Sequence, residues 1–213
     1  MTGPFTNRYR EADERLRKAA AFDLPYPFRT ESEGRPAAVL VLAGLREDGG
    51  GLELLITRRT ESIATHKGQY ALPGGMRDAD AETAEATALR EAREEVGVAE
   101  GDVETLGRLP AIWTPSGFSI TPVIGLLKRS IEEIEIRPSV EEIDLWFWCP
   151  ISRLREAGVY RSETREIVYQ GASRTVPVDV YLVDTHRIWG ATGAILRNFL
   201  TRLERVESDP GFG

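Results

Sequence analysis

The stretch from Gly74 to Val98 constrains the fold most, because it joins a glycine turn to a helix that carries three clustered acids. Glu91, Glu94 and Glu95 have i, i+3 and i+4 spacing, which places their carboxylates within an arc of about 100° on one helix face. Another sector of the same helix is apolar and suits a core: Leu89, Ala92 and Val96. We therefore expect a helix that packs on a core with one side and presents clustered charge on another.

The three glutamates point to metal chemistry when they are considered as a group. Carboxylates this close repel one another, and a hard divalent cation such as Mg²⁺, which prefers oxygen ligands and keeps several waters, relieves that repulsion. Arg90 lies four residues before Glu94, so it can pair with that carboxylate and fix its rotamer. A solvated acidic helix face is the alternative interpretation for three glutamates alone.

Glycines mark both ends of this stretch. Gly74 and Gly75 follow Pro73 and give the backbone the freedom to turn sharply and to approach a ligand closely. Gly97 stands where a helix commonly ends on a left-handed residue. We predict a helix over about residues 82–96, between these two glycine signals.

Composition narrows the class of protein. The chain has 213 residues, of which 41% are apolar and 29% charged, so it is long enough for one domain with a hydrophobic core. A net charge of −7 argues against nucleic acid as the main partner, whereas a phosphorylated small molecule stays compatible because a bound metal supplies local positive charge. We recognise no signal peptide and no membrane-spanning run, so we expect no membrane partner.

The single cysteine, Cys149, excludes an internal disulfide and favours a cytoplasmic location. It stands in the apolar run Trp146-Phe147-Trp148-Cys149-Pro150, where we expect a buried structural thiol rather than a nucleophile. The two tryptophans of that run are expected in the core rather than in a cofactor platform.

We divide the chain into an N-terminal helical arm at residues 1–36, a main domain at 37–205 and a C-terminal tail at 206–213. The arm contains a charged helix at residues 7–22 with a thin apolar stripe, and a proline-rich segment then breaks that helix. Three roles stay open for the arm: packing on the domain, a contact in a homodimer, or mobility.

Apolar runs and breaks in the main domain predict both strands and helices. We expect strands at residues 37–43, 52–57, 103–109, 119–127, 140–148, 166–170 and 176–183. We expect helices at residues 82–96, 151–157 and 189–205, the last with a core stripe of Leu196, Phe199, Leu200 and Leu203. Short strands before and after one acidic helix, with a closing helix, predict an α/β fold with a mixed β-sheet between helices.

Two segments of the glycine–glutamate stretch closely resemble the Nudix box. They are Leu72-Pro73-Gly74-Gly75 and Arg90-Glu91-Ala92-Arg93-Glu94-Glu95-Val96-Gly97-Val98, and the second matches the family pattern at every fixed position. In the first half, Glu82 stands at the family's glutamate position, but Gly75 lies one residue too early, so the loop is one residue longer than the common form. Glu85 is the alternative occupant of that glutamate role. The resemblance implies a Nudix-type α/β/α sandwich.

Further segments are similar to the coenzyme A diphosphatase branch of the Nudix superfamily. They are Leu55 to Thr60, His66 to Gln69, Ser116 to Gly125, Glu142 to Ile151 and His186 to Thr192. The last of these matches the start of the branch's final helix, so we expect His186 to help start that helix. The branch usually carries an arginine where this chain has Ala64, and Arg58, Arg59 or Lys67 could compensate for it.

The resemblance also implies a division of roles among charged residues. It implies Mg²⁺ or Mn²⁺ as the cofactor, with Glu91, Glu94 and Glu95 as its ligands. The implied catalytic residues are Arg90, Glu94, Glu95 and Glu142, and the three glutamates among them are the candidates for the proton acceptor. The implied substrate contacts come from Gly74, Gly75, Arg58, Arg59 and His66.

Three functional hypotheses follow from these observations. The favoured one is a metal-dependent diphosphatase that cleaves coenzyme A or an acyl derivative into 4′-phosphopantetheine and adenosine 3′,5′-bisphosphate, with Trp113 and Phe118 offering aromatic faces to the adenine. The second is a Nudix hydrolase of another nucleoside diphosphate derivative, such as ADP-ribose. The third is a non-catalytic ligand-sensing module, which the complete set of glutamates argues against.

Overall fold

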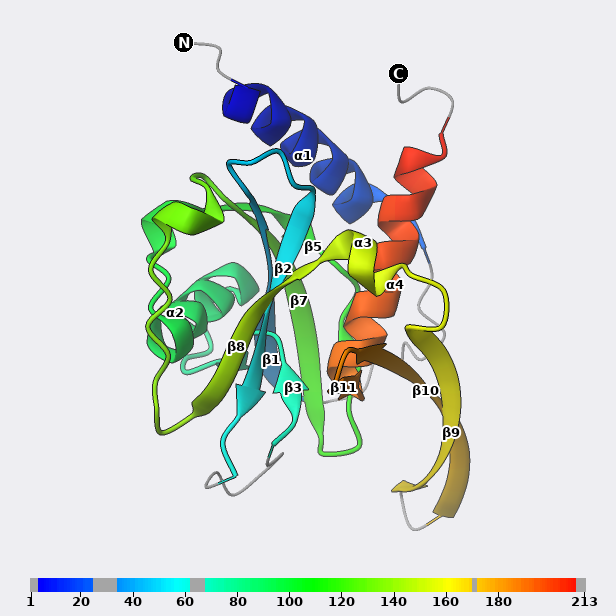
Figure 1. The fold of residues 1–213 in the computed structure, drawn as a ribbon. Coiled ribbons are helices and arrows are strands. Elements are labelled where there is room, and N and C mark those ends of the chain that lie inside the picture. The colour runs from blue at the N-terminus through cyan, green and yellow to red at the C-terminus, as the bar shows by residue number, and fades with distance from the viewer. Residues whose placement is uncertain (1–3, 25–33, 62–67, 170–171, 210–213) are drawn as a thin grey trace.

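The computed structural model describes residues 4–24, 34–61, 68–169 and 172–209 (Figure 1). Its helices are α1 (Pro4–Ala21), α2 (Ala84–Val96), α3 (Ile151–Leu154) and α4 (Ala191–Glu207). Its strands are β1 (Arg35–Leu45), β2 (Leu52–Arg59), β3 (Tyr70–Ala71), β4 (Gly74–Met76), β5 (Val103–Arg108), β6 (Ile112–Trp113), β7 (Phe118–Leu127), β8 (Ile143–Pro150), β9 (Tyr160–Tyr169), β10 (Ala172–Val183) and β11 (His186–Trp189). Short 3₁₀ turns cover Glu100–Asp102 and Ile131–Glu133.

Within the described ranges, the main sheet has eight strands. Five of them follow the order β3-β2-β1-β7-β5, while β4 pairs with β1, β6 pairs with β7 and β8 pairs with β2. β1 and β7 run parallel from Arg35 opposite Phe118 to Ala43 opposite Leu126. The other paired neighbours are antiparallel. The sheet is therefore mixed, which confirms the prediction from the sequence.

Helices cover both faces of this sheet (Figure 1). Leu40 and Leu42 of β1 belong to the apolar cluster under α2, whereas Val41 and Ala43 belong to the cluster shared with α1 and α4. Because both faces are covered, the central strands read as continuous apolar runs rather than as alternating ones. The resulting arrangement of helix, sheet and helices confirms the predicted α/β fold class.

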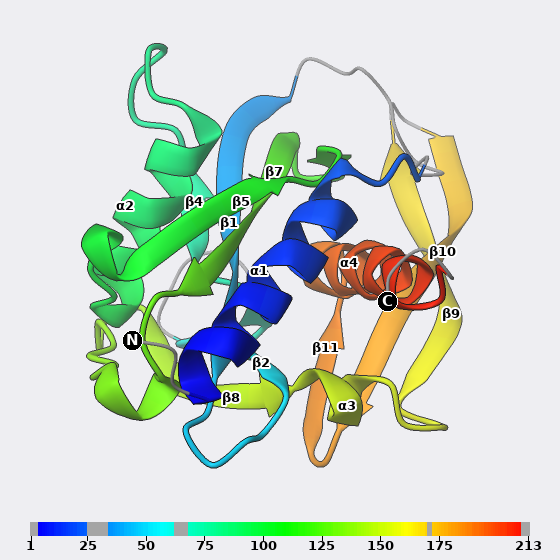
Figure 2. The ribbon, with the colours of Figure 1, turned by 90° about the horizontal axis from the view of Figure 1, so that it is seen from above.

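The N-terminal helix is part of the packed domain. α1 begins at Pro4, and its Ala12, Leu16 and Ala19 side chains are buried in the cluster shared with α4. Figure 2 shows α1 lying beside α4, and the two helices are in contact. Of the three roles left open for the arm, its described residues therefore show packing on the domain.

Arg202 of α4 fastens the end of α1. Its side chain is buried, and its guanidinium donates hydrogen bonds to the carbonyl oxygens of Ala19, Phe22 and Leu24. The Asn198 side chain, one turn earlier on α4, accepts a further hydrogen bond at 2.8 Å. Ala19 lies in the last turn of α1, where a helix leaves carbonyl oxygens without internal partners, and Phe22 and Leu24 follow the end of the helix. The contact therefore joins the two ends of the chain.

The region before the last helix differs from the sequence prediction. Residues 186–189 form strand β11, which pairs with β10, whereas we expected the final helix to begin there. A tight turn at Asp184, whose φ is 53°, reverses the chain and makes Val183 the partner of His186. Aspartate tolerates this left-handed conformation, so the turn forms without glycine. The expectation that His186 starts the final helix is wrong, since α4 begins at Ala191.

Other boundaries also shift. β8 begins at Ile143 rather than at residue 140, because Glu142 N donates to Ser139 O at 2.9 Å and closes a turn before the strand. β9 begins at Tyr160, so the hairpin with β10 is longer than the predicted pair of strands. Among the described residues, no helix has the length and apolar character needed to cross a membrane.

Candidate active site

α2 has a cap at each end, of which the C-terminal one, Gly97, was predicted from the sequence. Thr83, at the N-cap, accepts a hydrogen bond from Ala86 N at 3.2 Å, so the helix begins at Ala84 rather than near Glu82. Gly97 ends the helix in the left-handed region with a φ of 74°, as predicted. The helix packs on the sheet through small buried side chains: Ala84, Ala88 and Ala92, followed by Val96. This close packing carries Glu91 and Glu95 up to the glycine turn.

Glu95 is the most enclosed acid of the site, with a side chain that is 3% exposed. Arg59 Nη1 donates to Oε1 at 3.0 Å, and the backbone N–H of Gly74 donates to Oε2 at 3.1 Å. Burial raises the pKa of Glu95 to about 7, because desolvation outweighs the lowering effect of Arg59 and of Gly74 N–H. Arg59 and the Gly74 N–H thus fix the position of the Glu95 carboxylate but compensate its negative charge only in part.

Glu91 lies one turn earlier and faces Gly75. A Cβ atom on Gly75 would collide with the Glu91 carboxylate, so this position accepts no side chain without displacing that group. Burial raises the pKa of Glu91, and the negative charges of Glu94 and Glu142 act in the same direction. The glycine turn therefore makes room for a carboxylate, while the close backbone approach to a ligand stays a prediction.

Arg90 bonds to several acids of the carboxylate cluster at once. Its guanidinium donates to Glu91 at 2.9 Å, to Glu94 at 3.1 Å and to Glu82 at 2.9 Å. A fourth hydrogen bond, at 2.9 Å, reaches the carbonyl oxygen of Met76 in the glycine turn. The predicted Arg90–Glu94 pair is confirmed, and the same side chain ties the helix to the turn in front of it.

The structure identifies Glu82, and not Glu85, as the acid that bonds to Arg90. The Arg90 hydrogen bond, with a second from Asp78 N at 2.9 Å, holds the pKa of Glu82 at about 2. Glu85 instead pairs with the guanidinium of Arg108 in β5. The longer loop therefore still brings Glu82 to the place where an acid orients the arginine.

Glu142 reaches the cluster from a distant part of the chain. It precedes β8, and its carboxylate lies 3.7 Å from Arg59 Nη2. Its negative charge contributes to raising the pKa of both Glu91 and Glu95, so it lies close to these two acids. The structure thus brings together the four predicted acids, with Glu94 and Glu142 the more exposed and Glu91 and Glu95 the more buried.

Two predicted substrate contacts are not part of this cluster. Arg58 pairs with Asp144 at 2.8 Å, and its side chain lies on the sheet face opposite to α2, beside the ring of Tyr70. His66 lies outside the described residues. Side chains alternate along a strand, so Arg59 faces α2 together with Leu55, whereas Arg58 does not. The alternation separates the two arginines only once the structure fixes which face of β2 lies under α2.

The donor set suits a hard divalent cation. Carboxylate oxygens are the ligands that Mg²⁺ and Mn²⁺ prefer, and Glu91, Glu94 and Glu95 project them from consecutive turns of one helix. Within the described ranges, no three His, Cys, Asp or Glu side chains form a ready-made metal cluster. Their oxygens are instead bonded to Arg90 and Arg59. Two arginines at one acidic cluster show that the site requires positive charge, and this requirement supports the fit of a metal.

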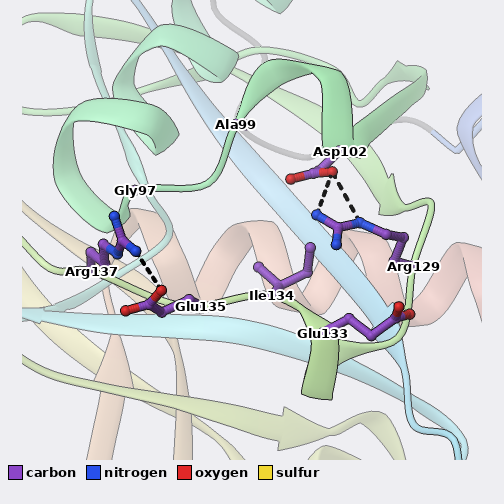
Figure 3. A pocket seen from close by; sticks show the side chains of 8 residues that line it. All are labelled: Gly97, Ala99, Asp102, Arg129, Glu133, Ile134, Glu135 and Arg137. Carbon is purple, nitrogen blue, oxygen red and sulfur yellow. Dashed lines mark hydrogen bonds and ion pairs between the residues drawn. The ribbon is translucent and has the colours of Figure 1, made fainter.

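A separate hollow of about 230 Å³ lies beyond the C-terminal end of α2 (Figure 3). Its lining includes two ion pairs, Asp102 with Arg129 at 2.8 Å and Glu135 with Arg137 at 2.5 Å. These four charges compensate one another within the hollow. We therefore place the candidate active site at the carboxylate cluster and not at this hollow.

Comparison with known proteins identifies the class. The NUDIX domain model matches residues 34–170, a segment that contains every acid of the cluster. The chain belongs to the Nudix hydrolase family. Members of this family generally use divalent metal ions such as Mg²⁺ or Mn²⁺.

Relatives that match over most of the chain include proteins named "Uncharacterized Nudix hydrolase NudL". The one from Escherichia coli strain K12 is 33% identical over 169 residues, which cover 79% of this chain and 83% of that protein. The one from Klebsiella pneumoniae is 33% identical over 179 residues, which cover 84% of this chain and 88% of that protein.

Solved structures support the fold. A MutT protein from Methanosarcina mazei has a TM-score of 0.52 at 16% identity, with 85% of this chain and 100% of that chain covered. A MutT/nudix family protein from Enterococcus faecalis has a TM-score of 0.51 at 18% identity, with 100% of this chain and 79% of that chain covered. At these identities the likeness bears on the fold alone.

Proposed function

We propose that this chain is a metal-dependent diphosphatase that hydrolyses a nucleoside diphosphate derivative, with coenzyme A or an acyl derivative as the preferred substrate. The products are then 4′-phosphopantetheine and adenosine 3′,5′-bisphosphate. The observation that carries the proposal is the meeting of Glu91, Glu95 and Glu142 around Arg59 and the glycine turn. A cluster of acids that needs positive charge, next to backbone that a ligand can approach, suits a substrate rich in phosphate.

Glu91 and Glu95 are the principal metal ligands in this proposal, and Glu94 adds a third carboxylate. When bound, Mg²⁺ or Mn²⁺ neutralises phosphate charge and lowers the pKa of water. Arg90 holds Glu91 and Glu94 in place through its hydrogen bonds, and Glu82 holds Arg90. Gly74 and Gly75 present backbone to the substrate.

One carboxylate must accept the proton of the attacking water. Both oxygens of Glu95 are already bonded, to Arg59 and to Gly74 N, which leaves it least free to move. Glu94 and Glu142 have side chains that are 48% and 45% exposed, so each can reach a water at the open side of the cluster. We therefore rank these two ahead of Glu95 as the general base.

The choice of coenzyme A rests on the segments outside the Nudix box that resemble the coenzyme A branch. Ala64, where that branch has arginine, favours a second candidate, the hydrolysis of another nucleoside diphosphate derivative such as ADP-ribose. Among the described residues near position 64, Arg59 lies at the acidic cluster, and its carboxylate partners commit it to the site rather than to a distant part of the substrate. Lys67 lies outside the described residues.

A hydrolysis panel tests the proposal. Coenzyme A, acetyl-coenzyme A, ADP-ribose, NADH and a diadenosine polyphosphate are incubated with Mg²⁺ or Mn²⁺, and products are identified by mass spectrometry. Glu94→Gln is the loss-of-function variant. Glu100→Gln is its matched control, because Glu100 is an exposed acid that pairs with Arg93 beyond the end of α2.

Each result of the panel has a defined meaning. We expect adenosine 3′,5′-bisphosphate to appear fastest from coenzyme A, to be lost in Glu94→Gln and to be retained in Glu100→Gln. Faster cleavage of ADP-ribose or of a dinucleotide rejects the coenzyme A part and leaves the diphosphatase part intact. Binding of these compounds without any turnover contradicts catalysis and supports a ligand-sensing module.

A further inference from the structure

The small sheet that follows α3 ends in an unusual edge. Among the described residues, β9 pairs with β10 alone, and the register runs without a bulge from Tyr160 opposite Tyr181 to Tyr169 opposite Ala172. Figures 1 and 2 both place β9 on the outside of the molecule. A regular edge of this length presents a row of backbone N–H and C=O groups that another strand can pair with.

Side chains along β9 carry charges of alternating sign on one face. Arg161, Glu163 and Arg165 share that face, because side chains two residues apart point the same way. Glu163 pairs with Arg161 at 2.9 Å and also with Arg187 of β11, while the Arg165 guanidinium lies 3.9 Å from the centre of the Trp189 ring. These contacts hold the charges in fixed positions beside the open edge.

A second copy of the chain fits this edge best in one register. A two-fold axis perpendicular to the sheet keeps every side chain on its own face. One residue of β9 then lies directly opposite the same residue of the other copy, and the axis lies midway between the two. With the axis at Thr164, Glu163 of each copy lies opposite Arg165 of the other. An axis at Glu163 or at Arg165 instead places two identical charges opposite each other, which is destabilising. An axis at Ser162 also opposes unlike charges, Arg161 and Glu163, but it pairs only residues 160–164 of each β9, whereas the Thr164 register pairs residues 160–168.

We propose that β9 pairs antiparallel with β9 of a second copy, with Thr164 on the two-fold axis, so that the two small sheets become continuous. Two Glu163–Arg165 contacts flank the axis, and Ser162 lies opposite Glu166 in the same register. Arg161 lies opposite Ile167.

The usual protections of an exposed edge are missing from this strand. Proteins prevent edge pairing with proline, lysine or bulges, and β9 contains none of these between Tyr160 and Tyr169. Charges on an edge also repel most partners, but a sequence that reads Arg-Ser-Glu-Thr-Arg opposes unlike charges when it meets itself in the Thr164 register. The same charges that exclude an arbitrary strand therefore select a second copy.

Charge exchange tests the register in the full chain. We expect the wild type to be dimeric in light scattering at micromolar concentrations. Glu163→Arg and Arg165→Glu each create two like-charge contacts, and each is expected to weaken the dimer at least about tenfold. An equimolar mixture of the two variants restores both opposite-charge contacts, so a heterodimer should form although neither variant pairs with itself. The double variant E163R/R165E should regain a homodimer.

The mixture separates loss of pairing from loss of folding. If a single substitution merely unfolded the hairpin, for example by removing the Glu163–Arg187 pair, mixing would not restore association. Arg174→Glu is the matched control, because Arg174 is an exposed arginine of the same hairpin on β10 and should leave the dimer unchanged. A monomeric wild type overturns the proposal, as does a dimer that ignores both substitutions or a mixture that stays monomeric.

Discussion

The two most deeply buried charged side chains among the described residues lie on opposite faces of the main sheet, and their surroundings differ. Glu95 under α2 and Arg202 under α1 are both 2% exposed. Glu95 accepts two hydrogen bonds and still has a pKa raised to about 7. Arg202 donates to three carbonyl oxygens at and just after a helix C-terminus and to an amide oxygen.

The surroundings of Glu95 and Arg202 show that a buried charge has a different role on each face of the sheet. A guanidinium at the negative end of a helix dipole, surrounded by acceptors, is stable where it stands and serves the packing of α1. A buried carboxylate with like charges nearby is unstable unless further positive charge arrives. We therefore infer that the α1 face is built for stability, whereas the α2 face gives up some stability to keep a site ready for a cation and phosphate.

The largest expected effect comes from Glu95→Gln. An amide keeps the shape and one acceptor but removes the negative charge, so we expect turnover of the diphosphate substrate to fall by about 10²- to 10⁴-fold. The free energy of unfolding should change little, because removal of a poorly compensated buried charge offsets the loss of one of the two hydrogen bonds that the carboxylate accepts. Urea unfolding without added metal and steady-state kinetics measure the two quantities. A clear loss of stability would mean that Glu95 stabilises the fold, as Arg202 does, and the proposed difference between the two faces would be wrong.

Arg202→Met should have the opposite profile. The side chain keeps its apolar length, but three carbonyl oxygens at and just after the end of α1 lose their donor, and we expect a loss of about 2–4 kcal/mol in the free energy of unfolding. Turnover at a temperature where the variant is folded should stay close to that of the wild type. Hydrogen exchange should quicken in α1 before it quickens in α2. Equal quickening in both helices would contradict a local fastening role.

Gly74 and Gly75 allow activity and stability to be separated at two adjacent positions of the glycine turn. A Cβ on Gly75 would meet the flexible end of Glu91, whereas a Cβ on Gly74 would meet the backbone of Ala38 and Val39. Gly75→Ala should therefore reduce turnover by about 10- to 100-fold, because a displaced ligand weakens metal binding, with little change in stability. Gly74→Ala should lower stability instead, because strand backbone cannot move aside. Calorimetric metal titration and thermal unfolding of both variants decide between these outcomes.

The parts of the molecule that the sequence predicted well are those with local signals. The acids of α2, the left-handed Gly97 and the apolar runs of β1 and β7 each depend on spacing or on a conformational preference of one residue. Cys149 was expected to be buried because its neighbours are apolar, and it is. The mixed sheet followed from the order of such elements.

Features that depend on distant partners escaped prediction. The sequence around Arg202 does not indicate that its hydrogen-bond acceptors lie about 180 positions earlier, because a single arginine forms no periodic pattern. The strand at His186 was missed because its pairing depends on a two-residue turn at Asp184 that carries no glycine. Within the site, the division between Arg58 and Arg59 needed the register of β2, which the apolar pattern alone does not fix.

The smallest effect concerns Glu82, which anchors Arg90 on the active-site face. The Arg90 hydrogen bond lowers the pKa of Glu82 from 4.5 to about 2, so its stabilising contribution is complete above pH 4.5 and is lost as the pH falls towards 2. Glu82→Gln should therefore cost about 1–2 kcal/mol at pH 7, and this difference from the wild type should shrink as the pH falls below 4.5. Urea unfolding at pH 7 and at pH 3 measures both values.

Glu85→Gln is the matched comparison on the same segment. Its partner Arg108 is half exposed, so the substitution should cost less than about 1 kcal/mol at pH 7. Turnover separates the two acids further, because only Glu82 reaches the ligand-bearing part of α2 through Arg90. If Glu85→Gln lowered turnover more than Glu82→Gln did, the role of orienting Arg90 would pass to the other acid. The longer glycine loop would then have displaced Glu82 from the site despite the contact that the structure describes.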